Sequence, residues 1–221
     1  APYKKLELSE QMIYVATLYI AINNVSVELL SNKNNDALND ARKMLYKAII
    51  YLEEIVTNAI DVQYSEIEDK VSQIAETTIE KRYYLIRKLG LVIQLLAEAF
   101  GDNSKWRWSF VELRGRFTTV AKNIINWKQG SKDYFDSQSE DYDTTIYFIR
   151  LVKSLLDQSA KEYRDRYELS THTMEDMRFA INYVLASRRI SIILGNSEEG
   201  EELKKKALVW KEKMEADKRG C

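Results

Sequence analysis

Cysteine, histidine, proline and glycine are all scarce in this chain of 221 residues, and each shortage excludes a class of structure or chemistry. Cys221, the last residue, is the only cysteine, so the chain can form no internal disulfide and no thiolate metal site. Proline occurs once, at Pro2, and glycine occurs 7 times. Because strand-rich folds need frequent turn residues, this scarcity predicts long helices with few connections.

The lone histidine, His172, excludes the histidine-based metal and hydrolase motifs. The glycine-rich phosphate-binding motifs are absent as well. Acidic residues gather at 131–143, but without the spacing and the central glycine of an EF-hand calcium loop, so we interpret them as a solvated connection. The sequence therefore predicts a protein that is not an enzyme and has no catalytic residues, no cofactor and no bound metal.

The charges of the chain are balanced, with 33 Lys and Arg against 34 Asp and Glu. Nucleic-acid binders usually carry a basic surplus, so we expect no nucleic-acid partner. An uninterrupted apolar run of membrane-spanning length is absent, which predicts no transmembrane segment. The Ala-Pro start suits either a mature exported protein or a shortened chain. We expect a periplasmic or otherwise exported protein, with a cytoplasmic location as the alternative.

Apolar residues recur at steps of three and four, which predicts an all-α fold. We expect an elongated bundle of about seven helices joined as antiparallel hairpins. The first helix is expected at 9–31, with Ser9 as its N-cap. Its predicted buried stripe is Met12, Val15, Tyr19, Ile22, Ser26 and Leu29. The second helix is expected at about 36–58, with its stripe at Leu38, Ala41, Leu45, Ala48, Leu52 and Ile55.

The third expected helix, at about 65–99, is the longest, with a more exposed first half carrying Ile67, Val71 and Ile74. A fourth helix is expected at 103–128. Its apolar residues follow the 4-3 spacing of a coiled-coil seam: Trp106, Phe110, Leu113, Phe117, Val120, Ile124 and Trp127.

The later helices are expected at 143–169, from 174 to 194, and after a turn at 195–197. Their predicted core residues are Ile149, Val152, Leu156, Tyr163, Met174, Met177, Ile181, Val184, Ile192, Leu203, Ala207, Trp210 and Met214. We predict an N-terminal helical bundle at 1–130, an acidic linker or loop at 131–143, and C-terminal helices at 144–221. These C-terminal helices are expected to pack on the same bundle, as a single domain or as two.

The fourth helix carries a second apolar patch. Trp108 lies two residues after Trp106, and therefore about 200° around the helix from it, with Val111 beside it. Such a patch is either buried within the fold or meets a partner. We select Trp108 and Val111 as candidate partner-binding residues, and Tyr134 and Tyr142 of the acidic segment as an extension of that surface.

The whole chain resembles the helical sheath proteins of spirochaete periplasmic flagella, the flagellar-coiling proteins. The likeness rests on the Ala1-Pro2 start, the helices that nearly lack Gly and Pro, the abundance of Tyr and Lys, and the long segment Ser65–Ala99. A shorter stretch, 11–56, resembles the first hairpin of flagellin-binding export chaperones through Leu18-Tyr19, the Asn-rich turn and Ala37-Leu38 to Ala48-Ile49-Ile50. The first resemblance implies a non-enzymatic protein laid along flagellar filament proteins.

We therefore expect a structural or scaffolding protein that binds other proteins in an extracytoplasmic assembly, such as a periplasmic flagellar filament sheath. The alternative is a soluble helical chaperone or adaptor that binds a partner helix in a groove. The oligomeric state and the role of Cys221 stay open.

Overall fold

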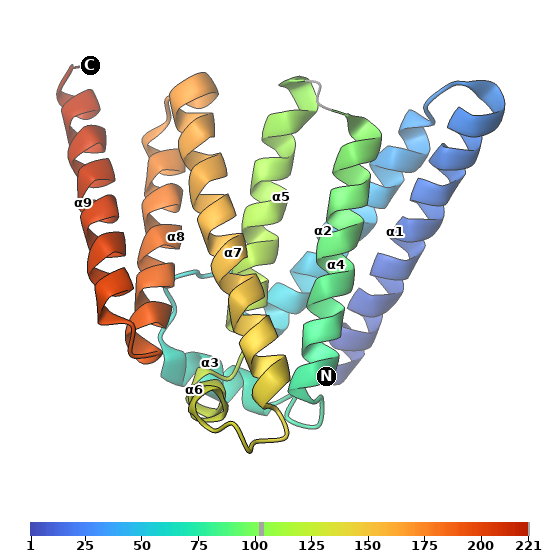
Figure 1. Cartoon of the computed structure of the whole chain (residues 1–221). Helices are drawn as coiled ribbons and strands as arrows, with labels where there is room; N and C mark the ends of the chain where they lie inside the picture. Colours follow the sequence, from blue (N-terminus) through green and yellow to red (C-terminus); the bar gives the residue numbers. More distant parts are fainter. Residues whose placement is uncertain (102–103, 221) are drawn as a thin grey trace. The chain divides into compact units, whose positions relative to one another are not determined.

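The computed structural model describes residues 1–101 and 104–220, with no account of the side chains at 104, 105 and 220. Cys221 and the expected helix start at Asn103 lie outside the described residues. Over the described chain the fold is all-α, as predicted, with nine α-helices and one short π-helical segment (Figure 1). These are α1 (Pro2–Leu30), α2 (Asn35–Val56), α3 (Tyr64–Ser72), α4 (Ile79–Phe100), α5 (Ser104–Asn123), α6 (Trp127–Phe135), α7 (Tyr142–Arg166), the π segment η1 (Tyr167–Thr171), α8 (Met174–Ile193) and α9 (Ser197–Gly220).

The chain divides into two compact units. The first contains residues 1–58 and 65–126, and the second contains residues 59–64 and 127–221. The acidic segment 131–143 lies within the second unit, and residues 131–135 form the end of α6 rather than a loop.

Helices α1 and α2 form the hairpin that opens the first unit (Figure 1). Asn34 is the N-cap of α2, and its side chain accepts a hydrogen bond from the backbone N–H of Ala37 at 3.0 Å. The predicted stripe of α2 is confirmed, because all six of its residues are buried.

The predicted stripe of α1 is wrong. Helix α1 begins at Pro2, and Ser9 lies inside it, where its hydroxyl donates to the carbonyl oxygen of Lys5 at 2.7 Å and that of Ala48 at 3.2 Å. Both Ile22 and Leu29, placed in the core by the sequence, are exposed. The face that contacts the rest of the unit is rotated away from the predicted one and consists of Leu6, Ser9, Ile13, Ala16, Ile20 and Asn23.

The single long helix expected at 65–99 is also wrong, because α3 ends at Ser72 and α4 begins at Ile79. Short-range turns fill the gap, such as the hydrogen bond from the N–H of Thr77 to the carbonyl of Ile74 at 2.9 Å. Thr78 then starts α4 as its N-cap, accepting from the N–H of Lys81 at 3.3 Å. The first half, 65–78, is the more exposed of the two, as expected, and its thin apolar stripe of Ile67, Val71 and Ile74 is buried.

The seam at 106–127 is confirmed over its middle. Phe110, Leu113, Phe117, Val120 and Ile124 are all buried. The seam does not lie on one continuous helix, because α5 ends at Asn123 and Trp127 begins α6 in the second unit. Asn126, directly before α6, belongs to the residue class that is favoured at a helix start.

In the second unit, α7 packs against α8 and α8 against α9. The core residues predicted for α7 are confirmed, as are Met177, Ile181 and Val184 of α8. Ala207 and Trp210 of α9 are buried as predicted, whereas Ile192 is exposed. Arg166 pairs with the buried Asp176 across the break between α7 and α8. The break between these two helices is confirmed, but it lies at 172–173, because residues 167–171 continue α7 as the π segment η1. His172 is exposed there with a left-handed backbone, φ 51°.

Candidate protein-binding surfaces

Val111 and Trp108 were selected from the sequence as partner-binding residues, and the structure shows one of them buried and the other half-buried. Val111 is only 2% exposed, so it is a buried residue and not part of a surface open to a partner. Trp108 is half-buried, with the guanidinium carbon of Arg107 4.7 Å from the centre of its ring. The physical reason is that α5 is buried around almost its whole circumference, so its second apolar patch lies inside the fold.

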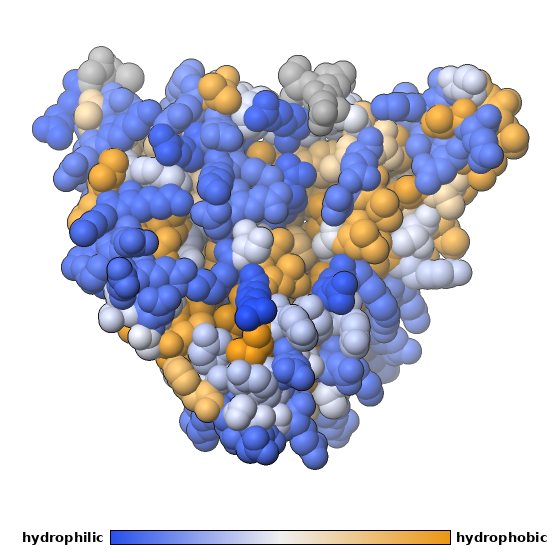
Figure 2. All heavy atoms as spheres, in the orientation of Figure 1, coloured by the Kyte–Doolittle hydropathy of each residue, from blue (hydrophilic) through white to orange (hydrophobic). Residues whose placement is uncertain are grey.

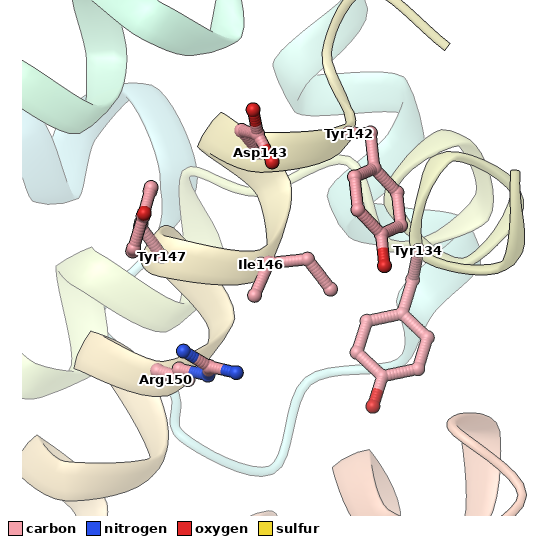
Figure 3. A pocket seen from close by; sticks show the side chains of 6 residues that line it. All are labelled: Tyr134, Tyr142, Asp143, Ile146, Tyr147 and Arg150. Atoms are coloured by element: carbon pink, nitrogen blue, oxygen red, sulfur yellow. The ribbon is translucent and has the colours of Figure 1, made fainter. Parts of the chain in front are cut away.

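Tyr134 and Tyr142, the other two predicted residues, line one pocket of the second unit, with a volume of about 400 Å³ (Figure 3). Tyr134 lies in the last turn of α6 and Tyr142 in the first turn of α7. The guanidinium group of Arg150 faces the tyrosine side of the pocket (Figure 3). The lining combines aromatic rings with one cation and the carboxylate of Asp143, which suits a peptide or another planar, polar group.

The acidic segment between these tyrosines is held by its own side chains. The carboxylate of Asp133 is buried and accepts from the side-chain amide of Gln129 and from the hydroxyl of Ser139, both at 3.0 Å. The carboxylate of Asp136 accepts from the N–H of Gln138 at 3.0 Å. These acids therefore stabilise the turns that bring Tyr134 and Tyr142 to one pocket.

Trp108 belongs to the first unit and the two tyrosines to the second. The four predicted residues are thus distributed between two compact units.

An apolar surface that the sequence did not predict lies on the outward face of α1. Tyr14 is 64% exposed and Leu29 is 74% exposed, and Leu18, Ile22 and Val25 between them are also exposed. The stretch 11–27 contains no charged residue. This uncharged stretch is the feature of the sequence that indicates the exposed apolar surface, because it makes α1 apolar on both its inner and its outer face.

Among the described helices, α1 has the length and apolar composition to cross a membrane, and 22% of its most apolar window is buried. Core helices of soluble proteins and signal sequences share this length and composition. The sequence did not predict a membrane-spanning helix here, because polar residues such as Asn23 and Asn24 interrupt the apolar run.

A groove of about 630 Å³ lies between α1 and α4. Tyr14, Thr17 and Leu91 line its apolar part, and Glu10 and Lys88 line it too, joined by an ion pair of 2.7 Å. On α4, Tyr84, Leu91 and Leu95 are exposed at steps of seven and four, so they share one face. Figure 2 shows hydrophobic side chains gathered over α1 and α4. The groove therefore continues the apolar surface of α1 onto a second helix.

The shifted titratable groups lie away from this groove and connect helices. Burial acts to raise the pKa of Glu199, but hydrogen bonds from Lys153 and Ser191 hold that pKa below its ordinary value. Burial raises the pKa of Tyr64, which packs on Trp127 with ring centres 5.7 Å apart, to about 12. No cluster of three or more potential metal ligands occurs among the described residues.

Comparison with known proteins finds one family model, that of the TP0443 family, which matches residues 1–218. Neither the curated proteins nor the solved structures give a match.

Proposed function

The chain belongs to the TP0443 family, and we propose that it is a non-enzymatic helical protein that binds other proteins through apolar helix faces. The observation that carries this proposal is the groove between α1 and α4, with the exposed Tyr14 and Leu91 in its lining. A soluble protein rarely leaves a contiguous apolar patch of this kind without a binding role.

The groove has the features of helix-in-groove recognition. An amphipathic partner helix presents apolar residues at steps of three and four. Tyr14 and Leu91 form an apolar floor for such residues, and the Glu10–Lys88 pair gives polar contacts at the side. Tyrosine is well suited to this setting, because its ring buries apolar area while its hydroxyl stays hydrated.

For its biological setting, we propose a structural or scaffolding role in an extracytoplasmic assembly, with a periplasmic flagellar filament as the partner. Support comes from the resemblance of the whole chain to flagellar-coiling proteins and from a family name of spirochaete type. The aromatic pocket of the second unit, with Tyr134 and Tyr142, supplies a further binding surface. A protein of a repeating lattice needs several distinct surfaces of this kind.

The second candidate function is a chaperone or adaptor that holds one partner helix. The groove itself favours it, because one groove of about 630 Å³ suits one helical segment. The two candidates differ in stoichiometry: a sheath protein adds repeatedly along a filament, whereas a chaperone forms a single saturable complex with a free subunit.

The test is co-sedimentation of the purified protein with isolated spirochaete periplasmic flagellar filaments, beside titration against dissociated filament subunits. The scaffolding role predicts repeated binding along filaments, and Leu91→Lys should weaken it, because the new charge lies in the apolar groove. Leu208→Lys, at an exposed position on α9, is the matched control. A one-to-one complex with free subunits alone favours the chaperone role, and binding to neither contradicts both.

A further inference from the structure

Four exposed residues of α1 form a regular apolar line, here called the outer seam: Leu18, Ile22, Val25 and Leu29. Their steps are 4, 3 and 4, the spacing at which one helix packs knobs into the holes of another. Ile22 is nine residues beyond the buried Ile13, which places it about half a turn around the helix from the core. The outer seam thus faces directly away from the residues that α1 packs against.

The charge pattern around the outer seam argues against a lipid surface. Amphipathic helices that lie on membranes usually carry Lys and Arg beside their apolar face. Helix α1 has no charged residue from 11 to 27, and the charge nearest the seam is that of Glu28. The side-chain oxygen of Asn23 accepts a hydrogen bond from the backbone N–H of Asn34 at 2.9 Å. If α1 spanned a membrane, this hydrogen bond would be lost. The spacing and the charges together favour another helix.

We infer that this helix is α1 of a second copy of the chain, packed antiparallel across a two-fold axis. The seam is complementary to itself in that orientation. Leu18 meets Leu29 of the second copy, and Ile22 meets Val25 of the second copy. A two-fold axis then uses the same patch on both subunits. In a parallel pair the two Glu28 carboxylates would lie at the same height along the helices, where their like charges repel. In the antiparallel pair each Glu28 lies beside the uncharged turn around Tyr19 of the second copy.

The exposed area on this side of α1 suits a small interface. Five large hydrophobic residues lie there, Tyr14, Leu18, Ile22, Val25 and Leu29, and their exposed fractions add up to about three whole residues. At about 150 Å² per large residue this is on the order of 450 Å². A standard interface buries about 800 Å² per partner, so the outer seam supplies about half of that area, which is typical of a weak, reversible dimer.

The orientation is tested by disulfide cross-linking in a chain with Cys221→Ser. Two single variants, Leu18→Cys and Leu29→Cys, carry tags of different size and are oxidised alone and as a mixture. The antiparallel pair predicts a covalent dimer of mixed size. Leu18→Cys alone should not cross-link, because the two positions 18 are separated by about 16 Å along the helices, far beyond disulfide reach. A Leu18→Cys dimer without the mixed dimer overturns the proposed orientation.

The dimer itself is tested by sedimentation across the micromolar range, with Leu18→Lys expected to weaken association by roughly tenfold or more. Val209→Lys on α9 is the control, since Val209 is exposed to a similar degree. A wild-type chain that stays monomeric overturns the inference, and so does one that binds phospholipid vesicles in a manner that Leu18→Lys abolishes.

The inference rests on the proposed role in protein binding, and the two can fail separately. A monomer that still binds filaments overturns the second-copy inference and leaves the proposed function in place. A dimer that binds no filament and no subunit supports the inference and contradicts the proposed function. The outer seam and the groove are altered by different substitutions, Leu18→Lys and Leu91→Lys, so the two results are read independently.

Discussion

Helices α1 and α5 of the first unit differ in a way that their compositions do not suggest. Helix α1 is the more apolar of the two, yet its outward face is exposed. Helix α5 is richer in polar and charged residues, yet it is buried along most of its length, including the side chains of Lys122 and Asn123. In this unit, burial therefore follows the position of a helix and not its mean hydropathy.

Polar groups in α5 are buried together with their hydrogen-bond partners. The hydroxyl of Thr119 donates to the carbonyl of Gly115 at 3.1 Å, and the side-chain amide of Asn123 donates to the carbonyl of Thr57 at 3.2 Å. Such bonds remove most of the cost of burying a polar group. The exposed leucines of α1 are covered by nothing within the chain, which is why the proposed binding surface lies on α1 and not on α5.

The largest expected effect on stability comes from a substitution in the buried helix, α5. Phe117→Ala in α5 should cost about 3–5 kcal/mol of unfolding free energy, from lost burial and from the cavity left behind. Urea titration of the variant beside the wild type measures this loss. Phe135→Ala, which removes an exposed ring, is the control. A loss below about 1 kcal/mol for Phe117→Ala would show that the ring is not packed as described.

The second effect concerns a buried polar group of the second unit. The pKa of Tyr64 is raised from 10.0 to about 12, because burial disfavours the phenolate, although Arg189 acts to lower it. The neutral phenol therefore adds stability below pH 10 that is lost as the pH rises toward 12. This change is about 2–3 kcal/mol for two pKa units. Unfolding free energies of wild type and Tyr64→Phe, measured below pH 10 and near pH 12, should diverge by this amount. Parallel pH profiles would contradict the prediction.

The third effect tests the close approach of α4 and α5. A Cβ added to Gly90 would lie 3.0 Å from Cζ of Phe117. Overpacking costs about 1–3 kcal/mol, and alanine returns about 1 kcal/mol through its higher helix propensity. We expect Gly90→Ala to destabilise the chain by about 1 kcal/mol, as the balance of these two effects. In the background of Phe117→Leu the same substitution should be neutral or stabilising. Equal effects of Gly90→Ala in both backgrounds would show that the two residues are not in contact.

The same contrast explains what could be predicted from the sequence. The buried face of α2 was predicted correctly, because its apolar residues lie on one face of the helix and its polar residues on the other. Helix α1 has apolar residues on both faces, and its inner face includes the polar Ser9 and Asn23. Periodicity therefore favoured the wrong stripe. The break at 73–78 was missed because Ile67, Val71 and Ile74 keep helical spacing up to and into the turn.

The candidate site was predictable only in part, for related reasons. The two tyrosines of the acidic segment were selected because tyrosine suits half-exposed surfaces, and the structure places Tyr134 and Tyr142 at one pocket. Val111 was selected by its angle around a single helix, which cannot show how many neighbours surround that helix. The groove between α1 and α4 joins residues more than seventy positions apart, such as Tyr14 and Leu91, and depends on the tertiary packing.

The smallest expected effect on stability comes from a substitution on the exposed face of α1. Leu29→Ala on α1 should change the unfolding free energy by less than about 0.5 kcal/mol, because little buried area is lost and alanine favours a helix. Leu52→Ala on α2 removes the same atoms from a fully buried position and should cost about 2–5 kcal/mol. Both are measured by urea titration at protein concentrations low enough to keep the chain monomeric, so that association through α1 does not contribute. Equal losses for the two variants would show that Leu29 is covered within a single chain and that α1 has no free outer face.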